Sequence, residues 1–329
     1  MYNIAIVGAT GNVGRKFLSI LEERNFPVKN LYLFASSRSK GKKMIFKGEE
    51  YIVEETSEDN IKSKDIDFAL FSAGGDASLE FAPIFSKYGA VVIDNSSAWR
   101  MDPKVPLVVP EVNPEDIKWH KGIIANPNCS TIQAMPVLKV IHDKYGLKRV
   151  VYSTYQAVSG AGIQAIKDLE DGIKGIAPKK FPKPIVGNVL PHIDVFLENG
   201  YTKEEMKMIN ETRKILHLDD LKVTATTVRV PVLNSHSESI NVETLKEFEL
   251  NDVIDAFVNS EGITVWNDVQ NLEYPTPLEV TDKDDVYVGR IRRDFSIDNG
   301  LNLWVVADNI RKGAALNAVQ IAELMINNK

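Results

Sequence analysis

The chain of 329 residues contains one cysteine, Cys129, and the residues around it could support nucleophilic chemistry. Residues 125–131 are small and polar, and a stretch with helical spacing follows from Ile132. A cysteine at a helix N-terminus feels the positive end of the helix dipole, which stabilises the thiolate. A lone cysteine is more often an inert core residue, but these turn-forming neighbours argue against simple burial. The sequence therefore indicates a reactive thiolate that can form a thioester.

A thiol that attacks a carbonyl group needs a proton acceptor, and histidine is the usual one. Three of the five histidines lie beside charged or helix-surface residues, where we expect them to be solvated: His120, His142 and His217. The other two, His192 and His236, lie in loop-like segments. Spacing alone does not choose between His192 and His236 as the partner of Cys129.

Arg229 emerges from an apolar strand candidate, and His236 closely follows it. A guanidinium in this position commonly binds a carboxylate through two parallel hydrogen bonds. A structural ion pair is an equally open interpretation.

A glycine-rich turn stands at the start of the chain, where Gly8, Gly11 and Gly14 separate an apolar run from a helical pattern. Glycines at this point let the backbone turn sharply and approach a pyrophosphate at the helix N-terminus. The spacing GxxGxxG is less specific than GxGxxG, and a purely structural turn is the alternative. Its place between the first strand and the first helix favours a dinucleotide site.

The residues after the second strand candidate indicate which dinucleotide binds. Sites for NAD usually carry an acidic residue there. This chain instead has Ser36, Ser37, Arg38 and Ser39, followed by lysines. Hydroxyl groups and a guanidinium suit a 2′-phosphate, so we expect NADP rather than NAD, with a solvated basic loop as the alternative. The segment Ser72–Gly75, after a later strand, is a second place where backbone could approach the cofactor.

The elements that must position these residues fall into two patterns. Residues 1–127 alternate short apolar runs with amphipathic stretches, which predicts a doubly wound, Rossmann-like α/β domain. Strands are expected at 4–7, 31–35, 68–72 and 91–93, with a helix over 13–24.

Residues 128–310 are predicted to form an α+β domain with a mostly antiparallel sheet. Strands are expected at 150–158, 222–232, 237–243 and 286–292, and helices at 132–144 and 203–216, with Pro136 implying a kink or a later start. Four prolines make 172–191 a predicted long loop, and a helix is expected over 313–326. Spacing does not say which domain this last helix joins.

Composition limits the classes of partner. The chain is 44% hydrophobic and 26% charged, with a formal net charge of -6 and a pI of about 5.5. The acidic charge argues against nucleic acid or an anionic membrane as a partner. The sequence has no apolar run long enough to predict a membrane span. Residues 1–7 show no pattern of a signal peptide. One cysteine fits the reducing cytoplasm. We expect small molecules or a second copy of the chain as partners, and no metal.

Four segments, in order along the whole chain, resemble aspartate-β-semialdehyde dehydrogenases: residues 8–14, 128–131, 155–162 and 229–236. The related N-acetylglutamyl-phosphate reductases share the fold, but their cysteine usually stands in a Gly-Cys-Tyr-like setting. The segment Asn128-Cys129-Ser130 fits the semialdehyde enzymes better.

This resemblance implies roles for particular residues. Cys129 would be the nucleophile, His236 the acid/base, and Gln156 the side chain that orients the substrate beside the thiol. Arg229 would bind the substrate α-carboxylate and Glu211 its ammonium. The phosphate would be bound by Arg100, Lys214 and Asn128. The implied cofactor contacts are Gly8, Thr10, Gly11, Asn12, Val13, Ser36, Ser37, Arg38, Ser39, Ser72, Ala73, Gly74, Ser159, Gly160 and Asn309.

The resemblance also implies a reaction: NADPH-dependent reductive dephosphorylation of β-aspartyl phosphate to aspartate β-semialdehyde and phosphate, through a Cys129 thioester. This step belongs to lysine, threonine, methionine and isoleucine biosynthesis. Family members act as homodimers or tetramers. Their C-terminal segment, here 311–329, completes the nucleotide domain.

Two other functions stay open. One is reduction of a different acyl phosphate, such as N-acetylglutamyl phosphate, or of an acyl-CoA. The other is a non-catalytic NADP-binding regulator. The joint presence of Cys129, Gln156, Arg229 and His236 counts against the regulator. Glu211, the implied partner of an ammonium group, counts against an N-acetylated substrate, whose nitrogen is uncharged.

Overall fold

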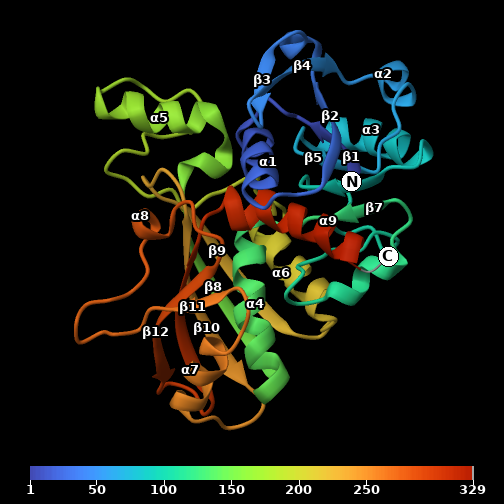
Figure 1. Ribbon diagram of the computed structural model, residues 1–329. Helices are drawn as coiled ribbons and strands as arrows, with labels where there is room; N and C mark the ends of the chain where they lie inside the picture. The colour runs from blue at the N-terminus through green and yellow to red at the C-terminus, as the bar shows by residue number, and fades with distance from the viewer. Residues whose placement is uncertain (328–329) are drawn as a thin grey trace. The chain divides into compact units, whose positions relative to one another are not determined.

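The computed structural model describes residues 1–327 and divides the chain into two compact units (Figure 1). The first unit comprises residues 1–128 with 314–329, and the second comprises 129–313. The division predicted from the sequence placed these boundaries after residue 127 and before residue 311. Residues 328–329 of the predicted C-terminal segment lie outside the described residues.

The first unit is built on a seven-stranded sheet with the order β3-β4-β2-β1-β5-β6-β7. All neighbouring strands are parallel except β3 and β4. The strands are β1 (Tyr2–Val7), β2 (Val28–Ala35), β3 (Lys43–Phe46), β4 (Glu49–Glu55), β5 (Phe68–Phe71), β6 (Val91–Asp94) and β7 (Ile123–Ala125). The chain leaves β1 toward β2 on one side and β5 lies on the other, so β1 is the switch point where such sheets bind ligands.

Helices cover this sheet with their apolar faces. The helices are α1 (Asn12–Glu23), α2 (Glu58–Lys62), α3 (Gly75–Lys87) and α9 (Asn317–Asn327). In α1, Phe17, Ile20 and Leu21 recur at helical spacing and are fully buried. Val319 and Ala322 of α9 join the same core. The C-terminal helix therefore packs within the first unit, although it follows the whole of the second unit in sequence.

The second unit contains a six-stranded sheet with the order β11-β12-β13-β10-β8-β9. The pairs β8-β9 and β11-β12 are parallel and the other three are antiparallel. The strands are β8 (Leu147–Gln156), β9 (Lys222–Arg229), β10 (His236–Thr244), β11 (Ile263–Val265), β12 (Val286–Asp294) and β13 (Gly300–Ala307). One end of the sheet carries the last residues of β8 and β9 and the first residues of β10. They meet there because β9 is parallel to β8 and β10 is antiparallel to it.

The second unit's helices are α4 (Cys129–Tyr145), α5 (Ile163–Ile173), α6 (Lys203–Leu216), α7 (Leu250–Val258) and α8 (Pro277–Val280). Figure 1 shows α4 and α6 beside one another, and both pack on the sheet. The helix predicted from Ile132 begins earlier, at Cys129, and continues through Pro136. Proline in a helix removes one hydrogen bond without always ending the helix, and here the first turn is buried from Ser130 onward.

The predicted long loop is partly helical, because α5 extends into it as far as Ile173. The remainder is tied down by Asp168, a buried residue of α5 whose carboxylate accepts backbone N–H bonds from Lys179, Lys180 and Phe181 at 3.0, 2.7 and 3.0 Å. Burial by itself would raise the pKa of Asp168, but these donors and Gln164 lower it to about 2. One buried carboxylate therefore orders a segment that proline content alone marked as irregular.

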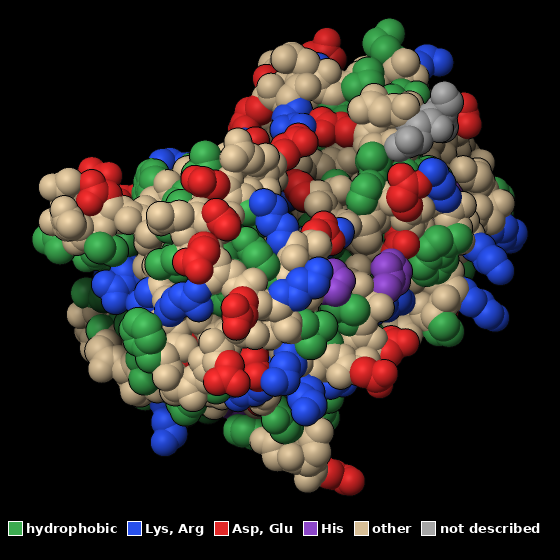
Figure 2. All heavy atoms as spheres, turned by 90° about the horizontal axis from the view of Figure 1, so that it is seen from below, with side chains coloured by type: hydrophobic (Ala, Val, Ile, Leu, Met, Phe, Trp, Pro, Cys, Tyr) green, Lys and Arg blue, Asp and Glu red, His purple; other side chains and the backbone are tan. Residues whose placement is uncertain are grey.

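The surface is of mixed charge. On the face drawn in Figure 2, acidic and basic side chains alternate among the described residues instead of gathering by sign. None of the helices within residues 1–327 is long and apolar enough to cross a membrane. Over the same residues, no group of three or more His, Cys, Asp or Glu side chains is arranged to hold a metal ion.

Candidate functional site

The first unit holds a pocket of about 410 Å³ at the carboxyl ends of β1, β2 and β5. Glycines allow the backbone segments that form this pocket to approach one another closely. Gly8 has φ +86°, and a Cβ on it would lie 2.3 Å from the Ser72 carbonyl oxygen. A Cβ on Gly14 would lie 2.3 Å from the Gly8 carbonyl oxygen, so α1 packs closely against the turn. This backbone cradle before a helix N-terminus fits a dinucleotide pyrophosphate.

Side chains around the pocket match much of the predicted set. Eight of the predicted cofactor residues line it: Gly8, Thr10, Gly11, Ser36, Ser37, Arg38, Ser72 and Ala73. Sequence reasoning missed Glu55, Thr56, Ala77 and Phe81, which also line it. Asn12, Val13, Ser39 and Gly74 are adjacent in sequence but are not among the lining residues. Buried Ser39 instead accepts a hydrogen bond from the Thr10 hydroxyl at 3.3 Å.

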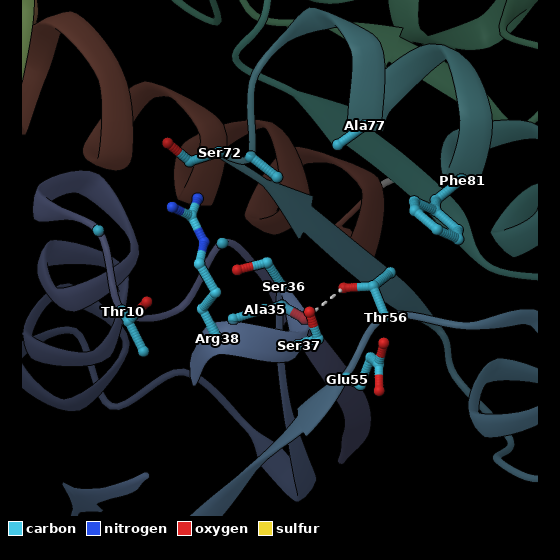
Figure 3. A pocket seen from close by; sticks show the side chains of 13 residues that line it. Thr10, Ala35, Ser36, Ser37, Arg38, Glu55, Thr56, Ser72, Ala77 and Phe81 are labelled. Carbon is cyan, nitrogen blue, oxygen red and sulfur yellow. Dashed lines mark hydrogen bonds between the residues drawn. The ribbon is translucent and has the colours of Figure 1, made fainter. Parts of the chain in front are cut away.

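Glu55 is a carboxylate at the pocket that comes from a neighbouring strand and not from the residues after the second strand. It ends β4 and pairs in register with Ala35 at the end of β2. Its carboxylate lies 3.7 Å from the Lys40 ammonium. In Figure 3, Arg38 lies on the side of Thr10, whereas Glu55 lies on the opposite side beside Thr56. The guanidinium thus has its own part of the pocket, where it can meet a 2′-phosphate.

We expect Arg38→Ala to weaken NADPH binding by about 100-fold and NADH binding by less than about threefold, because a charge-assisted bond to phosphate contributes roughly 3 kcal/mol. Fluorescence titration of both cofactors measures this. Lys43→Ala, in the adjacent basic stretch but outside the pocket, is the control and should change neither affinity. Equal losses for NADPH and NADH would show that Arg38 does not recognise the 2′-phosphate.

In the second unit, Cys129 is the first residue of α4 and its side chain is partly exposed. Its backbone is closely covered: a Cβ on Gly313 would lie 2.9 Å from the Cys129 Cβ and 3.3 Å from its Cα. Only glycine fits at 313 without moving the thiol. One turn further along α4, the Gln133 side chain donates to the His236 carbonyl at 3.4 Å, so this face of α4 packs on the start of β10.

His236, Arg229 and Gln156 occupy three neighbouring strand ends, and all three are buried. The Ala157 peptide links two of them. Its N–H donates to His236 Nδ1 at 3.0 Å, and its carbonyl accepts from Arg229 Nη1 at 2.6 Å. Burial lowers the pKa of Arg229, while the charges of Glu204 and Cys129 raise it, which places the thiol within electrostatic reach of the guanidinium.

The two candidate histidines have different surroundings. His236 is fully buried beside Arg229, whereas His192 stacks on Phe196 at a ring-centroid distance of 4.5 Å. His217 is exposed as predicted, but His120 and His142 are half-buried and each accepts a backbone N–H.

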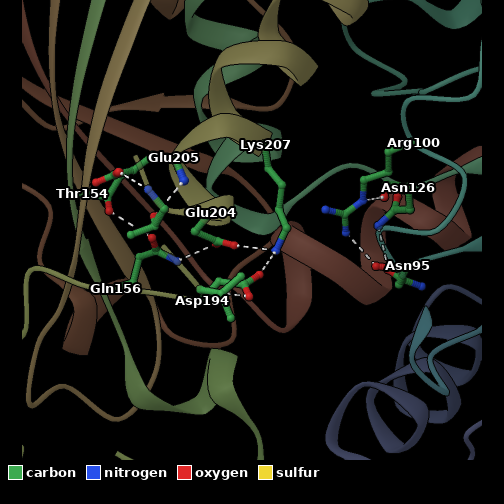
Figure 4. A network of polar contacts seen from close by, with 11 residues as sticks. Asn95, Arg100, Asn126, Thr154, Gln156, Asp194, Glu204, Glu205 and Lys207 are labelled. Carbon is green, nitrogen blue, oxygen red and sulfur yellow. Dashed lines mark hydrogen bonds and ion pairs between the residues drawn. The ribbon is translucent and has the colours of Figure 1, made fainter. Parts of the chain in front are cut away.

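A chain of polar contacts extends from Gln156 (Figure 4). Its amide oxygen accepts from the Thr154 hydroxyl at 3.0 Å, and its amide nitrogen donates to Glu204 at 3.2 Å. The other Glu204 oxygen pairs with Lys207 at 2.9 Å, and Lys207 also pairs with Asp194 at 2.8 Å. Burial by itself would lower the pKa of Lys207, but these two carboxylates raise it, so it stays charged.

This network places Glu204 and Lys207 beside Gln156, whereas the sequence-based prediction named Glu211 and Lys214. Both lie on α6, but they are seven residues beyond Glu204 and Lys207, about 10 Å along the helix axis. Glu204, not Glu211, contacts Gln156, and its charge acts on both Arg229 and His236. Glu204 is therefore the acidic residue next to Gln156, and Lys207 is the cation paired with it.

We expect Glu204→Gln to reduce kcat/KM by about 100-fold, because an ammonium group of a substrate would lose its buried counter-charge. Glu211→Gln is the matched control on the same helix and should stay within about threefold of wild type. Steady-state kinetics on both variants decide between the positions: a larger loss for Glu211→Gln would restore the sequence-based assignment.

The remaining residues predicted to contact phosphate or cofactor make hydrogen bonds or lie buried within their own units, except for an exposed glycine. Arg100 is buried in the first unit, where its guanidinium donates to the carbonyl groups of Asn126 and Asn95 at 3.0 and 2.7 Å. Asn128, also buried, ends the first segment of that unit. In the second unit, Asn309 accepts from the Ser235 N–H at 2.8 Å and donates to the Ser159 hydroxyl at 3.1 Å. These bonds order the loop around Asn309, while Gly160 is exposed.

Glu238 is a titratable residue that the sequence reasoning missed. It is fully buried on β10, two residues after His236 on the same face of the strand. Burial raises the pKa of Glu238 well above its usual range, and the Ser130 hydroxyl offsets only part of this effect. Burial thus favours the protonated form of this carboxyl group.

We expect Glu238→Gln to raise the melting temperature at pH 8 but not at pH 4. Above pH 4 the unfolded chain releases this proton while the folded chain keeps it, so the free energy of unfolding falls as pH rises, by about 1.4 kcal/mol for each unit of pKa difference. Glutamine removes that penalty. Calorimetry at both pH values measures the shift, and the exposed Glu247→Gln is the control. An equal shift at pH 4 would indicate a packing effect instead.

Comparison of the chain with known protein families finds two matching family models. Residues 3–120 match the model described as semialdehyde dehydrogenase, NAD binding domain. Residues 138–312 match the model described as semialdehyde dehydrogenase, dimerisation domain.

Individual relatives agree with these models. An aspartate-semialdehyde dehydrogenase of Aquifex aeolicus is 60% identical over 99% of this chain and 98% of its own. The crystal structure of aspartate semialdehyde dehydrogenase II from Vibrio cholerae complexed with ASA has a TM-score of 0.95 at 46% identity, over 99% of this chain and 98% of that one. A Candida albicans aspartate semialdehyde dehydrogenase with NADP has a TM-score of 0.78 at 26% identity, over 99% and 98% of the two chains.

Proposed function

The chain belongs to the aspartate-semialdehyde dehydrogenase family, and on this premise we propose that it reduces β-aspartyl phosphate to aspartate β-semialdehyde with NADPH, through a thioester on Cys129. The observation that carries the proposal is the gathering of Gln156, Glu204, Arg229 and His236 in the second unit, with Cys129 within electrostatic reach of Arg229.

Recognition of the substrate follows from charge. An amino-acid substrate carries an α-carboxylate and an α-ammonium group, and the site supplies Arg229 for the first and Glu204 for the second. Lys207 replaces Lys214 as the cation for a phosphate group on this helix, and Arg100 and Asn128 stay proposed phosphate contacts. An N-acetylated substrate has no charged nitrogen to pair with Glu204, which favours aspartyl over N-acetylglutamyl phosphate.

Catalysis by this chain rests on Cys129 as the nucleophile, with Gln156 orienting the substrate and His236 acting as the acid/base. Thiolate attack forms the carbon–sulfur bond of the thioester as phosphate departs. NADPH, when bound, supplies the hydride that reduces the thioester. Cys129 is the first residue of α4, where the positive end of the helix dipole stabilises its thiolate.

The cofactor would be held by the glycine cradle of the first unit, with the 2′-phosphate on Arg38, Ser36 and Ser37. The pocket geometry and the basic side chain support NADP. The Candida albicans relative with NADP provides a precedent.

Assembly and context are part of the same proposal. The match to a dimerisation domain over residues 138–312 supports a homodimer through the second unit, with a tetramer as an alternative. Light scattering after size exclusion measures this. A catalytic thiol must stay reduced, which supports a cytoplasmic enzyme. We place the reaction in the synthesis of lysine, threonine, methionine and isoleucine.

The deciding experiment is phosphate-dependent reduction of NADP with aspartate semialdehyde, run beside N-acetylglutamate semialdehyde. We expect turnover with the first substrate only, and only when phosphate is present. Preference for the acetylated substrate, or turnover independent of phosphate, would refute the proposal.

A further inference from the structure

The hydrogen bond between Ala157 and His236 determines where the imidazole carries its proton. The Ala157 N–H points at Nδ1 from 3.0 Å, so Nδ1 must be the acceptor and a neutral ring is protonated on Nε2. The opposite ring orientation would place a carbon against this buried N–H and leave the N–H unsatisfied. An imidazolium would set two N–H groups against each other.

The groups around the ring also oppose a positive charge on it. Arg229 of β9 lies near the ring: a Cβ on Gly160 would be 3.2 Å from both His236 Cε1 and Nε2, and 3.4 Å from Arg229 Nη1. Burial and the Arg229 charge lower the pKa of His236 to about 3, although Glu204 of α6 acts in the opposite sense. Burial raises the pKa of Glu238, on the same face of β10, and so favours its uncharged form. Cys129 of α4 interacts with Arg229.

We propose that His236 works as a neutral imidazole whose Nε2–H donates to the carbonyl oxygen of the substrate, and that Arg229, not an imidazolium, offsets the charge of the Cys129 thiolate. Nε2 is fully buried and has no hydrogen-bond partner within the described residues, so its proton is available to a bound group. The oxygen of a carbonyl under attack is such a group, because it becomes an oxyanion.

On this inference His236 acts as a hydrogen-bond donor in place of the acid/base role given to it above. The proposed reaction, on which this inference rests, balances without protonation of the ring. The thiolate sulfur bonds to the acyl carbon, the bond from that carbon to the phosphate oxygen breaks, and the phosphate takes one proton from solvent. A hydride then adds to the thioester carbon, the carbon–sulfur bond breaks, and the thiolate is regenerated with the aldehyde. His236 keeps its proton and strengthens its hydrogen bond twice, once at each tetrahedral oxyanion.

Nitrogen NMR of the enzyme with ¹⁵N-labelled histidine tests the protonation state directly, with His236→Asn to assign the signal. We expect one neutral ring with protonated Nε2 and unprotonated Nδ1, unchanged from about pH 5.5 to about pH 9. An imidazolium signal for His236 near neutrality, or a proton on Nδ1, would overturn the inference.

Alkylation of Cys129 by iodoacetamide tests the second half, because the chain has no other thiol to react. The measured quantity is the pH at which the alkylation rate reaches half its maximum. We expect this pH to rise by about one unit or more in Arg229→Gln, and to change by less than about 0.3 unit in Arg229→Lys and His236→Asn. In His236→Asn the amide oxygen can accept the Ala157 N–H, and cofactor binding reports that the chain is folded. A rise in His236→Asn equal to that in Arg229→Gln would establish a thiolate–imidazolium pair instead.

Neither measurement needs substrate. If the enzyme fails to turn over aspartate semialdehyde, the proposed function is wrong but the resting state of His236 is still determined. If it turns over and the imidazolium is observed, only the present inference fails.

Discussion

Cys129→Ala is expected to abolish turnover while the affinity for NADPH stays within about twofold of wild type. No second thiol is available to replace the nucleophile. Loss of a covalent nucleophile typically lowers kcat by a factor of about 10⁴ or more. The cofactor pocket is lined by residues of the first unit, whereas Cys129 begins the second. The two properties should therefore separate cleanly.

The measurement combines initial rates with a fluorescence titration of NADPH. Cys129→Ser is the conservative companion: it keeps the shape of the side chain, but a hydroxyl group is far less ionised than a thiol at neutral pH. We expect it to be inactive as well, with a normal melting temperature. Residual activity above about 1% in the alanine variant would exclude a covalent thioester as the main route.

Periodicity predicted the elements that place the site better than it predicted the site itself. The helix predicted at 203–216 has the bounds of α6. In the structure a capping box at Thr202 and Glu205 fixes its start. The strand carrying Arg229 and the strand beginning near His236 were also predicted. The meeting of their ends depends on the order β10-β8-β9, which no local pattern specifies.

The choice of acidic residue shows why spacing was insufficient. Glu204 and Lys207 have the same separation as Glu211 and Lys214, and the two pairs are seven residues, about two helical turns, apart. They therefore share one face of α6, and sequence alone cannot say which pair stands next to Gln156. Only the packing of α6 against the sheet selects Glu204.

The residues that the sequence analysis missed also depend on tertiary structure. Glu55 is distant in sequence from Arg38, yet the pairing of Ala35 with Glu55 brings it to the pocket. Ala157 acts through its backbone, which no side-chain pattern reveals. Glu238 was not singled out among the alternating residues of a strand, because its raised pKa follows from its complete burial.

For Arg229→Lys we expect kcat/KM for aspartate semialdehyde to fall by about 100-fold or more, while the reactivity of Cys129 changes little. Lysine keeps the positive charge near the thiol but offers a point charge where a carboxylate needs two parallel donors. It also loses the guanidinium that donates to Ala157 at 2.6 Å and supports the peptide bonded to His236.

Steady-state kinetics and the alkylation profile of Cys129, measured on the same preparation of Arg229→Lys, distinguish two functions of one side chain. Most of the loss should appear in KM if the bidentate contact mainly binds the ground state, and in kcat if it aligns the carbonyl group for attack. Lys222→Arg, at the exposed far end of the same strand, is the control for a basic substitution on β9 and should behave as wild type. Near-normal kinetics for Arg229→Lys would refute the bidentate contact and leave Arg229 only its electrostatic effect on the thiolate.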